Sequence, residues 1–204
     1  MFIKFSQTLA DKLKKTWMRL VLRGVHYSDN YKKLNAFYLV DDPWRMSDPS
    51  EIYRFTETNR LIIENFGRVD TLLEIGCGEG HQSLYLRQVC DRMIGLDVSA
   101  RAVERARSRC PQDEFLIGDI FSKEVDDLTP FDLVVANEVL YSMIDTPEVL
   151  QRMQKLSRNN FVTYHSGQMA NLDPQVLSLS GVNSEIIEFK DTRWRATWWC
   201  NDQV

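Results

Sequence analysis

From residue 69 onward, short apolar runs alternate with segments whose apolar residues recur every three or four positions. Apolar runs that stop at glycine or polar residues are typical of buried strands, and the three- to four-residue period predicts helices. The expected strands are Val69–Gly76, Asp91–Ser99, Asp113–Ile120, Phe131–Tyr141 and Asn159–Ser166, with helices over Gly80–Cys90, Ala100–Cys110 and Thr146–Ser157. This alternation predicts an α/β fold, in which helices cover both faces of a parallel sheet.

The C-terminal third ends in two further apolar segments, Ser184–Asp191 and Arg193–Asn201, which are close enough to pair as an antiparallel hairpin. The intervening stretch Gly167–Ser184 has room for one short helix. We therefore expect a Rossmann-like, doubly wound sheet of seven strands that is mostly parallel and has an antiparallel edge.

The first 66 residues have a different pattern and are expected to form a helical cap or lid, in one compact unit with a domain at residues 67–204. Met1–Arg23 holds six basic residues and one acid, with apolar residues at helical spacing. Two interpretations remain open for this helix: it docks on its own domain, or it binds an anionic membrane surface or a partner. An irregular stretch, Val25–Pro49, follows. A second helix is expected over Ser50–Phe66, with one apolar face formed by Ile52, Phe55, Asn59, Ile62, Ile63 and Phe66.

Composition and charge narrow the function classes. The chain has 204 residues, of which 44% are hydrophobic and 26% charged, as in ordinary globular proteins. A net charge of −4 argues against a nucleic-acid partner. The four cysteines form no CxxC pair and the three histidines are well separated, so we expect no metal site and no disulfide framework. A reducing, cytoplasmic location follows, with peripheral membrane contact through residues 1–23 left open.

The strongest chemical signal is the run Glu74–Gly80, E-x-G-x-G-x-G, which ends the first strand of the sheet. Glycines allow a sharp turn and close approach of a ligand, and the following helix start offers free N–H groups. Asp97 ends the second strand, 21 positions after Gly76, where a carboxylate can accept both hydroxyls of a ribose. The pattern differs from the G-x-G-x-x-G of dinucleotide enzymes. Asp97 by itself fits a nicotinamide dinucleotide and S-adenosyl-L-methionine (SAM) equally, and a purely structural glycine turn is the alternative.

A second carboxylate, Asp119 in IGDIF, follows the third strand and can accept a hydrogen bond from an adenine amino group. The neighbouring Ile120 and Phe121 can enclose the ring. The alternative is that Asp119 caps a helix that starts near Lys123. Asn137 and Glu138 come after the fourth strand, at the same edge of the expected sheet.

Taken in order, ExGxGxG, LDVS, GDIF and VVANEVLYSMID resemble the class I SAM-dependent methyltransferases. DDPW, GCGEGH and EVLY further resemble the nodulation N-methyltransferase (NodS-like) family, whose members methylate a sugar amine of a lipo-oligosaccharide precursor. The resemblance implies the strand order 3-2-1-4-5-7-6 and SAM as cofactor. It also implies a cofactor-binding set of Glu74, Gly76, Gly78, Gly80, Asp97, Val98, Asp119, Ile120 and Asn137. In that set the glycines shape the methionyl pocket, Glu74 and Asn137 serve the amino end, and the later carboxylates bind adenosine.

The segment DDPWRMSDPSEIYRF (residues 41–55) precedes the glycine turn and raises the question of a cover for the open sheet edge. Trp44 can pack against a sulfonium ion through its indole face, and Arg54 can pair with the carboxylate of SAM. Tyr31 lies in sequence that can fold over the same mouth. Alternatively, Trp44 only staples the N-terminal helices to the domain.

For methyl transfer, the candidate bases or acceptor-orienting groups are Glu138, Tyr141 and His165, with His81 as a further histidine near the glycine turn. The expected acceptor is a small molecule, a glycan or a glycolipid, methylated on nitrogen or oxygen. Two other classes remain open: a nicotinamide-dependent oxidoreductase, and a non-catalytic partner subunit that keeps the fold.

Overall fold

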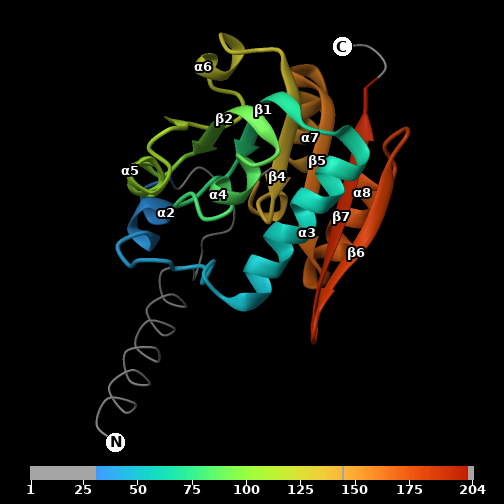
Figure 1. The fold of residues 1–204 in the computed structure, drawn as a ribbon, viewed down its shortest axis with the longest axis horizontal. Coiled ribbons are helices and arrows are strands. Elements are labelled where there is room, and N and C mark those ends of the chain that lie inside the picture. Colours follow the sequence, from blue (N-terminus) through green and yellow to red (C-terminus); the bar gives the residue numbers. More distant parts are fainter. Residues whose placement is uncertain (1–30, 144, 202–204) are drawn as a thin grey trace, which may run out of the picture.

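The computed structural model describes residues 31–143 and 145–201, which contain one seven-stranded sheet (Figure 1). The strands are β1 (Val69–Ile75), β2 (Cys90–Asp97), β3 (Glu114–Ile117), β4 (Phe131–Asn137), β5 (Ser157–His165), β6 (Asn183–Phe189) and β7 (Thr192–Cys200). Their order is β3-β2-β1-β4-β5-β7-β6, in which β7 pairs antiparallel with both neighbours and the other pairs are parallel. The expected fold class, strand order and C-terminal hairpin are confirmed.

Helices cover both faces of this sheet (Figure 1). They are α2 (Tyr31–Phe37), α3 (Pro49–Phe66), α4 (Ser83–Leu86), α5 (Ala100–Arg109), α6 (Lys123–Asp126), α7 (Thr146–Leu156) and α8 (Met169–Val176), with 3-10 turns η1 (Leu140–Ser142) and η2 (Ser166–Gln168). Within the described part of the chain, none of these helices has the length and apolarity needed to cross a bilayer. The amphipathic segment Met1–Arg23 lies outside the described residues.

Consecutive strand residues feed two separate cores. Leu72 packs in a cluster that includes Ile62 of α3 and Val103 of α5, whereas Leu73 packs in a second cluster with Leu150 of α7. Successive side chains of a strand point to opposite faces, so a strand between two helical layers is apolar at nearly every position. The two cores hold the sheet rigid between them, and its carboxyl-terminal edge is left to the loops.

Two expected helices differ from those observed. The helix expected over Gly80–Cys90 is only α4, because β2 already begins at Cys90 and the Val69 N–H donates to the Val89 carbonyl at 3.0 Å. The sheet thus takes the end of a segment whose apolar spacing also suited a helix. Residues 25–49, expected to be irregular, contain the short helix α2 in their described part.

The helix expected over Ser50–Phe66 is present as α3, but its buried face is shifted. Ile52 and Ile63 are 41% and 45% exposed, and Arg54 is buried instead at 1% exposure. An arginine can be buried where every part of its guanidinium finds a polar partner, and α3 meets such partners at the sheet edge. Polar contacts with the site therefore set the rotation of α3.

Candidate active site

The glycine turn lies at the carboxyl-terminal edge of the sheet, between β1 and α4. The N–H groups of Gly76 and Cys77 both donate to the Leu96 carbonyl of β2, at 2.7 and 3.0 Å. Gly76 has φ of 71°, and a Cβ at this position would lie 2.5 Å from Cγ2 of Val139. Only glycine fits both the conformation and the space.

Asp97 stands beside this turn, as the sequence spacing predicted. Its carboxylate accepts the N–H of Gly78 at 2.9 Å and that of Ser99 at 2.8 Å. Burial raises the pKa of Asp97 to about 6, although these two hydrogen bonds act in the opposite direction. Each carboxylate oxygen keeps a second lone pair that can accept a ligand hydroxyl. Val98, the next residue, is half-buried.

At the end of β3, Asp119 accepts the Phe121 N–H at 2.9 Å, just before Ser122, the N-cap of α6. This contact fits the helix-capping interpretation. The Ile120 side chain is buried in the second core, and its position does not match a side chain that encloses a ligand ring. Phe121 and Ile117 are the exposed apolar side chains at this edge.

Arg54 is the central cation of the site. Its Nε and Nη2 donate to Glu51 at 2.9 and 2.8 Å, and Nη1 donates to Gln82 at 2.9 Å and to Thr163 at 3.3 Å. Arg54 thus joins α3 to the glycine-turn segment and to β5. The carboxyl groups of Glu74 and Glu138 lie close enough for its charge to lower both of their pKa values.

Both of these glutamates nevertheless keep protons unusually well. Burial raises the pKa of Glu74 to about 8, and its carboxylate accepts the Ser83 hydroxyl at 2.5 Å. Burial also raises the pKa of Glu138 to about 7, against the effect of Arg54. Glu138 has φ of 55°, and the Tyr141 hydroxyl donates to its carboxylate at 3.2 Å. Backbone strain of this kind is frequent at functional sites.

Three buried polar atoms at this edge have no hydrogen-bond partner: Nε2 of Gln82, Nδ2 of Asn137 and Oε1 of Glu138. The other ends of the two amides are bonded, Gln82 to Arg54 and Asn137 to the Thr163 hydroxyl at 3.0 Å. Native proteins rarely leave buried polar groups unpaired except where a ligand or water pairs with them. Two donors and one acceptor suit a ligand end that carries both a carboxylate and a cationic group.

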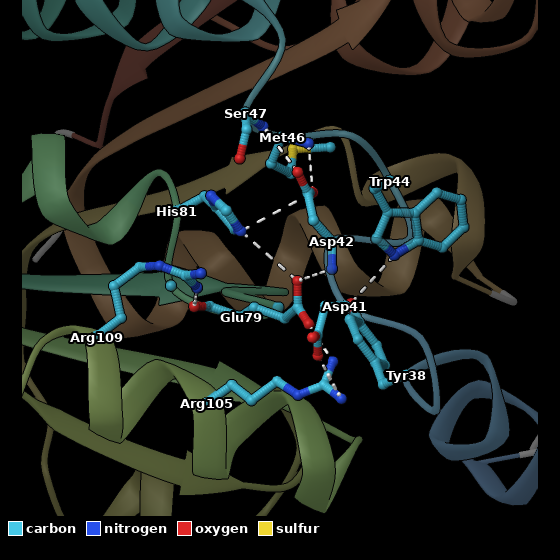
Figure 2. Close-up of polar contacts among 12 residues, drawn as sticks. Tyr38, Asp41, Asp42, Trp44, Met46, Ser47, Glu79, His81, Arg105 and Arg109 are labelled. Atoms are coloured by element: carbon cyan, nitrogen blue, oxygen red, sulfur yellow. Dashed lines mark hydrogen bonds and ion pairs between the residues drawn. The ribbon is translucent and has the colours of Figure 1, made fainter. Parts of the chain in front are cut away.

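The remaining sequence candidates have partners of their own. The His165 ring accepts the Gly167 N–H at 3.1 Å and caps η2, so among the candidate bases the described structure brings together Glu138 and Tyr141. The Trp44 ring lies 4.4 Å from that of Phe37, and its Nε1 donates to the Tyr38 hydroxyl at 3.1 Å (Figure 2). These contacts fit the interpretation of Trp44 as a staple.

Sequence reasoning did not find three groups of this site: Tyr38, Gln82 and Thr163. The Tyr38 hydroxyl lies 3.1 Å from the Cβ position of Gly78, directly over the glycine turn. Gln82 lies two positions after the turn, and this proximity was a signal that could have been used. Tyr38 and Thr163 come close only through the tertiary fold, and no local pattern identifies them.

One cluster in the described part of the chain has donor atoms of the kind that bind metals: Asp42, Glu79 and His81, whose donors lie within 4.8 Å of one another. The carboxylate of Glu79 already accepts hydrogen bonds from Arg105 and from the Asp42 N–H. We therefore interpret the cluster as a network of ion pairs.

With this geometry established, comparison with known proteins is informative. Residues 68–198 match the family model described as a methyltransferase domain. Nodulation protein S of Rhizobium tropici is 32% identical over 139 residues, which cover 66% of this chain and 57% of that protein. A malonyl-[acyl-carrier protein] O-methyltransferase of Pectobacterium atrosepticum is 29% identical over 114 residues, covering 54% and 45% of the two chains.

Solved structures agree. The N-methyltransferase NodS from Bradyrhizobium japonicum WM9, in complex with S-adenosyl-L-homocysteine (SAH), superposes with a TM-score of 0.71 and 26% identity, covering 85% of this chain and 98% of that one. The magnesium protoporphyrin IX methyltransferase from Synechocystis PCC 6803, with a TM-score of 0.59 and 13% identity over 91% of this chain and 97% of that one, shares the fold. The chain spans 57% to 62% of the length of the curated nodulation proteins that it matches.

Proposed function

The chain belongs to the methyltransferase domain family, and from this membership we propose that it transfers a methyl group from SAM to a nitrogen or oxygen atom of a small-molecule, glycan or glycolipid acceptor. Nitrogen is the favoured atom, because the similar NodS structure is that of an N-methyltransferase. The observation that carries the proposal is the set of unpaired buried groups on Gln82, Asn137 and Glu138, which lies at the same sheet edge as Asp97.

In this proposal the chain holds SAM along the carboxyl edge of the sheet. Asp97 accepts the ribose hydroxyls, and the exposed Phe121 and Ile117 border the adenine. The amides of Gln82 and Asn137 donate to the methionyl carboxylate, next to the cation Arg54. Gly76, Gly78, Gly80 and Glu74 form the wall beneath the methionyl part, where a larger residue would fill the space.

SAM, when bound, supplies a methyl group that is already activated by its sulfonium, so the residues of the chain mainly position groups and move a proton. An amine acceptor must lose a proton before it attacks. Oε1 of Glu138 has no partner and can take that proton, while the Tyr141 hydroxyl orients Oε2 at 3.2 Å. A pKa near 7 suits a base at neutral pH.

The described part of the N-terminal segment, residues 31–66, acts as the cover. Asn35 accepts from the Ser99 hydroxyl at 3.0 Å and from the Arg101 N–H at 3.1 Å, which fixes α2 against α5. Tyr38 then lies over the glycine turn, and α3 brings Arg54 to the sheet edge. A cover of this kind keeps water from the reacting groups.

Titration calorimetry tests the proposal directly. We expect SAM and SAH to bind and a nicotinamide dinucleotide to give no heat. Methyl transfer is then measured with amino-sugar oligosaccharides and with their N-acetylated counterparts as acceptors. Binding of the dinucleotide without binding of SAM would favour an oxidoreductase. SAM binding without turnover on any amine or hydroxyl acceptor would favour a non-catalytic subunit.

A further inference from the structure

The loop of residues 41–47, between α2 and α3, is fastened to the glycine turn by charged side chains (Figure 2). The Asp42 N–H donates to Oε2 of Glu79 at 2.9 Å. Nε2 of His81 lies 3.6 Å from the same oxygen and 3.8 Å from Oδ1 of Asp42. One imidazole therefore faces two carboxylates, one on the loop and one on the turn.

Asp42 also sets the shape of its own loop. Its Oδ1 accepts the Met46 N–H at 2.6 Å and its Oδ2 accepts the Ser47 N–H at 3.1 Å. Asp42 and Arg45 both have positive φ, 43° and 60°. Such a loop keeps its conformation only while the Asp42 carboxylate stays in place. Whatever holds Asp42 against Glu79 therefore holds the whole loop.

Helix α5 approaches the cluster from the other side. Arg105 donates to Oε1 of Glu79 and to the Val40 carbonyl at 3.0 Å, and its Nη2 lies 2.9 Å from Asp41. Arg109 donates to the backbone carbonyl of Glu79 (Figure 2). The charged groups that face His81 are thus the carboxylates of Asp42 and Glu79, with Arg105 and Arg109 beyond Glu79.

Both carboxylates are charged at neutral pH. Burial alone would raise the pKa of Asp42, but the hydrogen bonds from Ser47 and Met46 outweigh it and lower the value. Burial also opposes the net change at Glu79, whose pKa is lowered by His81 and Arg105. Since Arg105 is shared with Asp41, the cluster gains a balancing positive charge when the imidazole is protonated.

The loop matters because of what it covers. Trp44 of the loop donates to the hydroxyl of Tyr38, and that hydroxyl lies over Gly78. Building on the proposed function, we propose that Asp42, Glu79 and His81 form a proton-dependent latch that keeps the loop closed over bound cofactor while His81 is charged. Cofactor exchange is faster once the imidazole is neutral.

The sign of the pH dependence follows from the two kinds of group. The carboxylates have lowered pKa values, so their contribution is present above their ordinary values and is lost as the pH falls through the lowered ones. Histidines ordinarily change charge between about pH 5 and 8, and the contribution of a charged imidazole is lost as the pH rises. The latch is thus strongest in mildly acidic solution.

Limited trypsin digestion of the full chain, without cofactor, tests the latch. The bond after Arg45 is protected because the Met46 N–H is bound to Asp42. At pH 6, His81→Gln should speed cleavage there by roughly fivefold, the effect of one partly buried ion pair. The ratio of the two rates should approach one at pH 8.5. His81→Lys, which keeps a positive charge, should stay protected at both values.

Controls separate the latch from general effects. Glu57→Gln removes a carboxylate that pairs with Arg60 within α3, at 2.9 Å, and should be cleaved like the wild type. Cleavage after Arg92 on β2 reports on folding and should not change. Equal cleavage of His81→Gln and wild type at pH 6, or the same protection at pH 6 and pH 8.5, overturns the latch.

The dissociation rate of SAH connects the latch to the cofactor. His81→Gln should release SAH roughly fivefold faster than wild type at pH 6, with the same loss of difference at pH 8.5. If the wild type binds no SAH, the proposed function fails, and the digestion result still decides the latch. If SAH binds and its release is the same in both proteins, the latch is wrong and the proposed function stands.

Discussion

Three carboxyl groups at the carboxyl edge of the sheet keep their protons to higher pH than they would in water. Burial raises the pKa of Glu74 to about 8, of Glu138 to about 7 and of Asp97 to about 6. Arg54 lowers the first two values but does not outweigh burial. Perturbed pKa values of this kind concentrate at functional sites, and a bound cation would favour their charged forms.

Glu138 gives a prediction at the scale of one residue. A base with a pKa of about 7 is active when deprotonated, so kcat/KM should rise with pH through about 7. Glu138→Gln keeps the size of the side chain but removes the base, and should reduce kcat at neutral pH by about 10²- to 10⁴-fold. The pH profile of methyl transfer to an amine checks this.

The same profile distinguishes the competing base. His165→Gln should keep the limb near pH 7, because the ring of His165 is engaged with the Gly167 N–H. A limb that survives in Glu138→Gln and disappears in His165→Gln would transfer the role of base to the histidine.

Single residues differ in how far the sequence could predict their place. Asp97 was placed correctly because a residue that ends a parallel strand must lie at the sheet edge. Arg54 was also named, although its burial among Glu51, Gln82 and Thr163 was not foreseen, since two of these partners lie 28 and 109 positions away. Ile120 was misjudged because the chain alone does not show which face of a turn points into the core.

At the scale of elements, the glycine turn joins β1 to α4 under two independent constraints, and these can be separated. Gly76→Ala introduces a Cβ at φ of 71° and 2.5 Å from Val139. Gly181→Ala is a matched control, because Gly181 has φ of 67° and no atom within 4 Å of its Cβ position. The left-handed conformation costs about 1–2 kcal/mol at either site.

Urea unfolding of the two variants measures the difference. Gly181→Ala should lose only the conformational term, while Gly76→Ala should lose about 1–3 kcal/mol more because the close contact forces Val139 to move. It should also weaken SAH binding. Equal destabilisation by the two substitutions would show that the turn can relax away from Val139 without cost.

The strands were easier to predict than the helices for a physical reason. A strand such as β4, Phe131–Asn137, is buried on both faces, and its apolar run reports directly on that burial. Helix α4 lies where the apolar residues Leu86, Val89 and Cys90 fit either a helix or the start of β2, and hydrogen bonding to β1 decides for the strand. Short-range patterns do not contain that competition.

At the scale of the whole molecule, two cores fix a sheet whose one edge carries the acidic groups, so the pH dependence of stability reflects the site. Glu74 has its pKa raised from 4.5 to about 8, so the folded chain binds a proton that the unfolded chain has lost. That contribution is fully present below the unfolded value and is lost as the pH rises through about 8.

Glu74→Gln makes this linkage measurable. The amide resembles the protonated acid, so the variant should be more stable than wild type at pH 8.5, by about 1–3 kcal/mol, and nearly equal to it at pH 5.5. Thermal unfolding at both values checks the expectation, with Glu57→Gln in α3 as a control that should shift little at either pH. A wild-type chain whose stability relative to Glu74→Gln is the same at both values would mean that Glu74 is already ionised in the fold. The site would then present a fixed negative charge to its ligand, and a proton released on SAM binding would have to come from Glu138 or Asp97.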